Sequence, residues 1–467
     1  MADDLLDALA PVLTRWTIGG DAAPAAPPAW APALGSDSPE LRLLAIAGHI
    51  LGGFVVPTPA TPLRNLPDLP ALALPTVSAR LRPLLRRLLA GADARQRRII
   101  IGFVAARGRV MHPADWLPPA NDDALPDVYA PWRDWAAACA AGGPARSASG
   151  ELSEATWDDF GPAARDLALG LLRRRDPAAA RALIAAKLPT ADADGRLRLV
   201  IALATGLGAD DRPLLESLGN DRAPRVKTQV AILLARLGVG EAAGAEMAEL
   251  AGFFEIQTRG LLRRTRHLVP RPIKTPAQTK RRGELLDAAD FAGFAAALGL
   301  TATELAELWS FDGDVFLAAR FVAVAARSAD DAVITALHAA LAARPSVDFA
   351  IIAALQPRLT TAQTQALLRP ALLSGGPGTL AAALDIAGAD PRFDDILRAP
   401  AFAAILGDLA RDGRAAMPAD LWALGLLASP AAARGARDRL VAAGLAAADP
   451  RLDSLRLNIM LDEEGRQ

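Results

Sequence analysis

The chain of 467 residues carries a formal net charge of −1, and 52% of its residues are hydrophobic but only 5% are aromatic. This charge balance excludes a strong overall field that would draw the protein to nucleic acid or to a membrane surface, and the single cysteine, Cys139, excludes an intramolecular disulfide and a multi-cysteine metal site. Because alanine and leucine, the strongest helix formers, supply much of the apolar content, we expect helices throughout.

Residues 1–145 are expected to form an N-terminal helical region with proline-rich linkers. A helix is predicted over residues 3–16, and the proline- and alanine-rich stretch 17–36 is expected to be a linker or strap because it cannot continue that helix. Ser38 and Pro39 are typical of a helix start, and a second proline-rich connector covers 57–75. Two basic amphipathic helices follow over 78–109, and we expect the tryptophans of 110–158 to fill gaps between helices.

Localisation is predicted from the N-terminus and from the longest uncharged stretch. The first residues, MADDLLDALA, are acidic and lack the basic segment that begins a secretory signal. The apolar part of residues 43–63 ends at Pro57, which leaves it shorter than the roughly 20 residues that a membrane-spanning helix needs. We therefore expect a cytoplasmic protein with no membrane segment.

Residues 146–262 show the most regular pattern, which predicts stacked antiparallel helices of 9–14 residues joined by short polar turns. Asp176 is expected to cap a helix that has Pro177 at its first position. Asp221 is expected to lie in a turn, where its carboxylate accepts free amide hydrogens of the next helix. That helix carries one buried apolar stripe with helical spacing, which consists of Val226, Val230, Leu233, Leu234 and Leu237.

The stretch NDRAPRVKTQVAILLARLG, residues 220–238, resembles the second helix of a HEAT repeat. The resemblance rests on Asp221, Val226 and Lys227, although arginine is commoner where Lys227 stands. Together with LRRRDPAAARALI at 172–184 and GLGADDRPLLESL at 206–218, it is similar to a family of uncharacterised bacterial helical-repeat proteins that carry a domain of unknown function. Leu188 stands where that family tends to have tryptophan. Members are often encoded beside MoxR-type AAA+ ATPases and von Willebrand factor A proteins, which implies a protein partner and no catalytic residue.

The second half of the chain begins with a basic interruption. Residues 263–283 are expected to form a basic loop, because RRTRHLVPRPIKTPAQTKRR contains eight lysines or arginines, several prolines and no acid. This stretch is open to two interpretations, a solvated loop or a loop that binds phosphate or acidic groups. Helical repeats are predicted again over 284–467, with capping boxes from Thr301 to Glu304 and from Thr360 to Gln363.

Motifs that carry chemistry are missing from the sequence. There is no phosphate-binding GxxxxGK[ST] loop, no GxSxG nucleophile elbow and no HExxH zinc motif, and the four histidines are far apart. We therefore predict no catalytic residue, no cofactor and no metal. The fold expected is all-α, a HEAT-like α-solenoid of stacked antiparallel helices.

Two functions remain open. The first is a non-enzymatic scaffold that binds a protein partner, such as a MoxR-type AAA+ ATPase. The second is a nucleic-acid-binding solenoid, with or without base-repair activity, because residues 80–109 hold nine arginines against one acid, Asp93, and could join the basic segment near 270 on one face. The candidate residues for binding a partner or phosphate are Arg86, Arg87, Arg263, Arg264, Arg281 and Arg282.

Overall fold

A computed structural model describes residues 2–54, 66–119, 122, 125–141, 151–239, 244–259, 265–412 and 418–466. Within these residues the protein contains 24 α-helices and one two-stranded sheet, so the all-α class is confirmed. The chain divides into two compact units, residues 1–66 and residues 67–467. The boundary between the units lies inside residues 1–145, which the sequence predicts to form one helical region.

The smaller unit is built on α1 (Ala2–Thr17), α2 (Ala31–Leu34) and α3 (Pro39–Phe54). The stretch 17–36, expected to be a linker or strap, instead folds into α2 and two short 3₁₀ helices. It contributes Trp30 and Leu34 to a small core, and Glu40 accepts hydrogen bonds from Trp16 Nε1 at 2.9 Å and from the Ala23 amide at 2.6 Å. The stretch 17–36 is therefore part of the fold.

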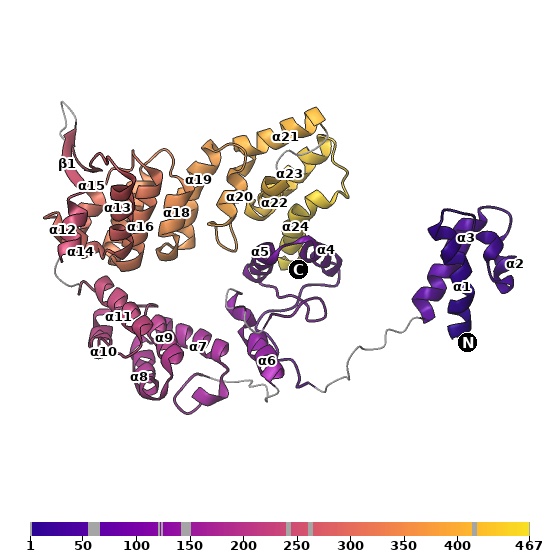
Figure 1. Ribbon diagram of the computed structural model, residues 1–467, viewed down its shortest axis with the longest axis horizontal. Helices are drawn as coiled ribbons and strands as arrows, with labels where there is room; N and C mark the ends of the chain where they lie inside the picture. Colours follow the sequence, from indigo (N-terminus) through magenta and orange to yellow (C-terminus); the bar gives the residue numbers. More distant parts are fainter. Residues whose placement is uncertain are drawn as a thin grey trace. The chain divides into compact units, whose positions relative to one another are not determined.

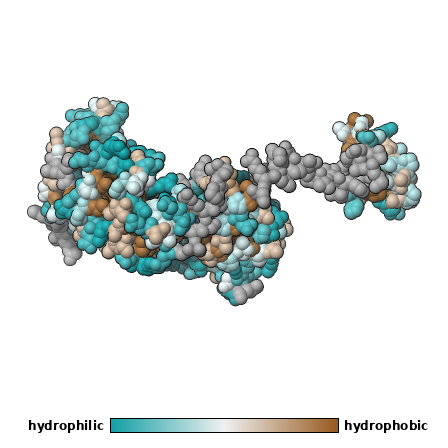
Figure 2. Space-filling view, turned by 90° about the horizontal axis from the view of Figure 1, so that it is seen from below, coloured by the Kyte–Doolittle hydropathy of each residue, from teal (hydrophilic) through white to brown (hydrophobic). Residues whose placement is uncertain are grey.

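The smaller unit also exposes large apolar side chains. The most exposed of them are Leu13 on α1, Ile18 directly after α1, and Leu41 and Leu44 on α3. Figure 2 shows hydrophobic residues at the surface of this unit.

The larger unit contains the remaining helices in four stretches. The first two stretches contain α4 (Arg82–Gly91), α5 (Ala94–Ala106) and α6 (Ala130–Ala141), then α7 (Pro162–Arg175), α8 (Pro177–Lys187), α9 (Ala193–Ala202), α10 (Arg212–Ser217), α11 (Pro224–Arg236) and α12 (Ala245–Ala251). The third contains α13 (Pro276–Ala288), α14 (Phe291–Ala297), α15 (Ala302–Leu308), α16 (Val315–Ser328), α17 (Asp331–Ala342), α18 (Phe349–Leu355) and α19 (Thr361–Ser374). The last contains α20 (Thr379–Leu384), α21 (Pro400–Asp412), α22 (Pro418–Leu427), α23 (Pro430–Ala442) and α24 (Asp453–Gly465).

Helices that are two apart in sequence lie side by side in several parts of the larger unit. The helix α9 contacts both α7 and α11, α16 contacts α18, and α22 contacts both α20 and α24 (Figure 1). Their buried faces form two hydrophobic clusters, one within residues 152–233 and one that joins residues 77–132 to residues 250–461. The short loops between the helices make such pairing the expected outcome.

The basic segment expected to be a loop instead contains regular structure. Strand β2 (Thr265–Pro270) pairs antiparallel with β1 (Phe254–Arg259), with Phe254 opposite Pro270, and α13 begins at Pro276. Arg263 and Arg264 lie outside the described residues. The hairpin is anchored through Phe254, whose ring lies 5.4 Å from the rings of both Phe294 and Trp309. The aromatic contacts explain why this segment leaves the helical rhythm without leaving the core.

Local helix signals in the sequence are confirmed by the structure. Thr301 and Glu304 form one capping box and Thr360 and Gln363 another, as expected. A further capping box, between Asp93 and Gln96 at the start of α5, was not predicted.

The first and last parts of the larger unit pack together. Arg87 on α4 donates to both carboxylate oxygens of Asp453 on α24, at 2.6 and 2.9 Å, and Arg109 donates to the carbonyl oxygen of Glu464 at 2.9 Å. Leu81 and Leu455 belong to the same hydrophobic cluster. Segments more than 350 residues apart thus share one core.

Whether a helix can cross a membrane depends on its length and its apolar content. None of the helices of the described residues taken alone is long and apolar enough to cross a bilayer, whereas α14 and α15, which meet at 81°, reach that length and composition together. Both helices of this bent pair bury apolar residues in the core, among them Phe294 and Leu305.

Candidate functional site: a charged groove on α7 and α9

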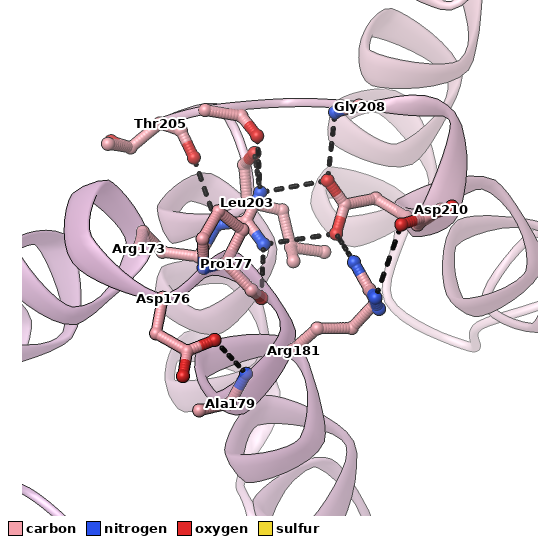
Figure 3. A network of polar contacts seen from close by, with 11 residues as sticks. Arg173, Asp176, Pro177, Ala179, Arg181, Leu203, Thr205, Gly208 and Asp210 are labelled. Carbon is pink, nitrogen blue, oxygen red and sulfur yellow. Dashed lines mark hydrogen bonds and ion pairs between the residues drawn. The ribbon is translucent and has the colours of Figure 1, made fainter.

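The turns around α7 and α8 are held by a buried arginine, Arg173. Its side chain is inaccessible to solvent and donates to both carboxylate oxygens of Asp211, at 3.0 and 2.8 Å. Its remaining hydrogen bonds go to backbone carbonyl oxygens, including those of Thr205 at 2.9 Å and Pro177 at 3.1 Å (Figure 3). Every edge of the planar guanidinium is thereby used, so one side chain fixes the end of α7, the start of α8 and the loop that follows α9.

Asp211 completes this clamp from the start of α10. Its carboxylate also accepts from the Gly208 amide at 3.0 Å and from Arg181 Nη1 at 3.2 Å. Burial disfavours the charged form, but the hydrogen bonds from Arg173, Gly208 and Arg181 outweigh burial and hold the pKa of Asp211 below its ordinary value. The carboxylate is ionised at neutral pH and serves the fold.

A second clamp joins α9 to the turn before α11. Arg196 donates to the two oxygens of Asp221 at 2.8 and 3.1 Å, and to the carbonyl oxygen of Ala191 at 3.0 Å. Asp221 also accepts the Ala223 amide at 2.7 Å. The expected turn position of Asp221 is therefore found, together with an arginine partner that the sequence did not predict.

The other residues of the predicted repeat motif have structural positions. Asp176 accepts the Ala179 amide at 2.9 Å, and Pro177 is the first residue of α8, as expected. Val226 is fully buried, whereas Lys227 is exposed on α11. The motif thus builds the turns and the core between the helices, although Asp176, Pro177 and Lys227 are exposed.

The N-terminus of α7 is capped by a neighbouring helix. Asp134 on α6 accepts the amides of Ala163 at 3.1 Å and Ala164 at 2.9 Å. Gly161 precedes α7, and a Cβ atom at that position would clash with the Asp134 carboxylate. A glycine is required here because the cap comes from the side rather than from the preceding residue.

Two adjoining clefts of about 610 and 820 Å³ run over this region. They share Pro162, Asp166 and Arg198, and so form one groove along α7 and α9. We call this surface the α7/α9 groove. Its charged lining residues are Asp127, Arg133, Asp134, Asp158, Arg165, Asp166, Arg174, Lys187, Asp192, Asp194 and Arg198.

The centre of the groove is the pair of Asp166 and Arg198, whose charged atoms are 3.9 Å apart. Burial by the surrounding helices raises the pKa of Asp166, and the positive charges of Arg198 and Arg165 oppose the effect. Each of the two paired side chains remains about half accessible, so water limits the shift and both groups can reach a bound molecule.

One end of the groove is walled by Trp157. The guanidinium carbon of Arg165 lies 4.5 Å from the centre of the indole ring, and Lys187 Nζ lies 5.8 Å from it. Arg165 is held in place by hydrogen bonds to the carbonyl oxygens of Trp157 and Phe160, at 3.1 and 3.0 Å. The wall is therefore rigid and presents positive charge beside an aromatic face.

The other end of the groove is bordered by apolar side chains that no neighbour covers. Ile201 lines the first cleft and is 49% exposed, and Leu171 is 53% exposed. Leu167, Leu171 and Arg174 have the spacing i, i+4 and i+7, which places them on one face of α7. The groove thus combines charges of both signs with exposed apolar area.

The arginines expected to bind a partner or phosphate differ in the groups that they contact. Arg86 donates to Asp115 at 2.7 Å and Arg87 to Asp453, whereas Arg281 donates to both oxygens of Glu249, at 2.9 and 2.6 Å. The structure therefore gives Arg86, Arg87 and Arg281 acidic partners within the chain. Arg282 lies in a different cleft, between α13 and α16.

Most arginines of residues 80–109 are neutralised by acids elsewhere in the chain. The pairs are Arg80 with Glu463, Arg82 and Arg86 with Asp115, Arg87 with Asp453, Arg95 with Asp385, Arg107 with Asp390 and Arg109 with Glu464. Hydrogen bonds from Arg82 lower the pKa of Asp115 to about 2, with Arg86 assisting. The sequence could not predict these pairs, because most of the acids lie more than 280 residues away.

The described residues contain no cluster of three or more histidine, cysteine, aspartate or glutamate side chains that could hold a metal ion. The acidic side chains of the α7/α9 groove lie among arginines and lysines, and this mixture suits recognition of a charged chain.

Comparison with known proteins gives one match. A family model described as "Family of unknown function (DUF5691)" matches residues 16–454. No curated protein and no solved structure matches the chain.

Proposed function

Because the chain belongs to the DUF5691 family, whose function is unknown, we propose a function from its own surface: it is a non-enzymatic helical-repeat scaffold that binds a segment of a protein partner along the α7/α9 groove. The proposed partner, following the resemblance described above, is a MoxR-type AAA+ ATPase. The observation that carries the proposal is that two clefts meet at Asp166 and Arg198 and form one long groove.

The lining of the groove supports a peptide-like occupant. Acidic and basic side chains both line it, together with the exposed apolar side chain of Ile201. A protein segment offers the same mixture of charged and apolar groups, and interfaces of this kind have apolar contacts beside a polar rim. The clamps at Arg173 and Arg196 hold the helices that form the groove, which limits the entropy lost on binding.

We also propose that the helices form a HEAT-like solenoid. Pairing between helices that are two apart in sequence supports this arrangement. Arginine–aspartate bonds recur between neighbouring units, with separations of 38 residues for Arg173–Asp211, 25 for Arg196–Asp221 and 27 for Arg358–Asp331. Repeat proteins stabilise each unit through contacts with its neighbours, and these bonds are such contacts.

The charge distribution favours a protein partner over nucleic acid. Nucleic-acid binding requires arginines and lysines that are free to replace counterions on phosphates. The arginines of residues 80–109 instead pair largely with acids of the same chain, as does Arg281. Titration of labelled duplex and single-stranded DNA at low salt is expected to give no saturable binding, and tight binding that weakens steeply with salt would reverse this preference.

Site-specific photocrosslinking tests the proposal. A photoreactive amino acid is placed at Ile201 in the groove, or at Lys227 on the exposed face of α11 as the matched control, and purified MoxR-type ATPase is offered as the partner. We expect crosslinks from position 201 only, and their loss in the Arg198→Glu variant but not in the Lys227→Glu variant. Equal crosslinking from both positions, or no crosslinking from position 201, contradicts the proposal.

A further inference from the structure

A second binding site is indicated by Arg282, which differs from the other arginines that the sequence singled out. Its side chain belongs to α13 and the residue is only 9% exposed. Among the residues that the structure describes, no hydrogen bond or ion pair within 4 Å reaches its guanidinium, and its electrostatic contact is with the more distant Asp314. Its guanidinium nitrogens are not among the enclosed atoms that lack a partner, so they face the cleft, and their N–H donors are available to water or to a ligand.

Arg282 lines a cleft of about 330 Å³ between α13 and the start of α16. The two other cations of the cleft already have partners, since Lys280 lies 3.7 Å from Glu284 and Arg320 lies 3.5 Å from Asp287. Arg282 is therefore the cation of this cleft whose charge is least compensated. Burial lowers its pKa, and the negative charge of Asp314 opposes that change, but an arginine remains charged at any physiological pH.

Asp314 does not bond to Arg282 in this structure. It is the N-cap of α16, and its Oδ1 accepts the amides of Phe316 at 2.9 Å and Leu317 at 3.3 Å. Moving Oδ1 onto Arg282 would leave those amides without an acceptor. An external oxyanion would satisfy Arg282 without disturbing the helix.

The cleft also has an apolar border. Phe316, at the start of α16, is 79% exposed, the largest exposed fraction of any large hydrophobic residue among those described. An exposed phenylalanine beside an uncompensated guanidinium matches a ligand that carries a carboxylate next to an apolar group. A planar carboxylate can take two parallel hydrogen bonds from the guanidinium, and the apolar group would cover the ring.

We propose that the α13/α16 cleft binds an acidic segment of the partner protein, with an aspartate or glutamate carboxylate on Arg282 and a neighbouring apolar side chain on Phe316. This inference rests on the proposed function in one respect, that the chain binds a protein. It adds a second contact, on a different part of the larger unit from the α7/α9 groove.

The test uses the full chain and random 12-residue peptides displayed on phage. Enriched peptides are expected to contain an acid within two positions of an aromatic or large aliphatic residue. A synthetic peptide of the enriched sequence, measured by fluorescence polarisation, is expected to bind at least about tenfold more weakly to Arg282→Met. Binding to Phe316→Ala is expected to weaken about fivefold, as for the loss of roughly 40 Å² of apolar contact. Changing the acid of the peptide to its amide should match the loss seen with Arg282→Met.

Further variants keep the test decisive. Phe316 is exposed, so Phe316→Ala keeps the fold even if Arg282→Met unfolds, and Arg282→Lys keeps the charge but loses the paired hydrogen bonds. Arg281→Met, on the adjacent residue, is the matched control and should leave binding unchanged. Circular dichroism and thermal melting of each variant establish that it is folded.

Four outcomes overturn the inference. No enrichment, enriched peptides without acids, or Arg282-dependent binding of inorganic phosphate without binding of the peptide would each do so. Peptide binding that is lost in Arg198→Glu but kept in Arg282→Met and Phe316→Ala places the occupant in the α7/α9 groove. In that case the inference fails while the proposed function stands. Conversely, peptide binding that depends on Arg282, without crosslinks from position 201, supports the cleft and contradicts the groove.

Discussion

Replacing Asp211 with asparagine tests whether the buried clamp at Arg173 stabilises α7 to α10. The change keeps the shape of the side chain, but it removes the negative charge and turns one acceptor oxygen into an amide donor that faces other donors. Removing one partner of a buried ion pair costs about 3–5 kcal/mol. Because Arg173 keeps acceptors at the carbonyl oxygens of Thr205 and Gly206, we expect the lower end of this range, about 3 kcal/mol.

The effect is best measured locally, because a unit of this size need not unfold in one step. Hydrogen exchange of peptides that span residues 203–217, read by mass spectrometry, should accelerate on the order of a hundredfold for a loss of about 3 kcal/mol. The matched control is Arg175→Ala, two residues from Arg173. Arg175 pairs with Glu151 while their side chains are 65% and 76% exposed, and such surface pairs contribute at most about 1 kcal/mol.

The pH dependence gives a second measurement on the same variant. A carboxylate whose pKa is lower in the folded state stabilises the fold above its unfolded pKa, which is about 3.9, and this contribution is lost as the pH falls through the folded pKa. The difference in exchange between wild type and Asp211→Asn should therefore be full at pH 7 and shrink below about pH 4. Equal exchange in Asp211→Asn and Arg175→Ala at pH 7 refutes the reasoning.

Three further predictions concern single side chains in the larger unit. Gly425→Ala should destabilise the protein by about 1–3 kcal/mol in urea unfolding, because the new Cβ would lie 2.5 Å from the Leu455 amide nitrogen. Gly170→Ala, in a helix with open space around the glycine, should instead stabilise it by about 0.5–1 kcal/mol. The opposite order of the two stabilities would contradict the packing. Asp420→Ala should lower the free energy of unfolding by about 1–2 kcal/mol and speed hydrogen exchange at the start of α20, because Asp420 accepts the amides of Gly378 and Ala381 there. Unchanged exchange would show that this cap does not stabilise the helix. In carboxyl NMR, Asp115 should titrate near pH 2 in wild type and at a higher pH in Arg82→Ala. Its contribution to the stability of wild type should therefore fade between about pH 4 and pH 2. The same titration in both proteins would show that pairing with Arg82 does not lower the pKa of Asp115.

Features decided by neighbouring residues could be predicted from the sequence. The caps at Thr301, Thr360 and Asp176 have their hydrogen-bond partners three residues away, and the apolar stripe that begins at Val226 follows from helical spacing alone. Such signals need no knowledge of the tertiary structure. They gave the all-α class and the starts of several helices.

Features decided by distant residues could not be predicted in the same way. Asp134 accepts the amide of Ala163, which is 29 residues away, and Asp420 accepts the amide of Gly378, which is 42 residues away. The arginines of residues 80–109 appear as a basic segment until the acids of α24 are placed beside them. Arg281 and Arg282 are adjacent in sequence, yet the helix directs one toward Glu249 and buries the other. Net charge along a segment therefore overstated the positive surface.

The bond between Arg87 and Asp453 has a consequence for biosynthesis. The two residues are 366 positions apart, so α4 leaves the ribosome long before its partner helix is made. At roughly 5–20 residues per second, this interval lasts about 20–70 s. During that time α4 can pack on α5, which follows it directly, but the part of α4 that contacts α24 stays uncovered.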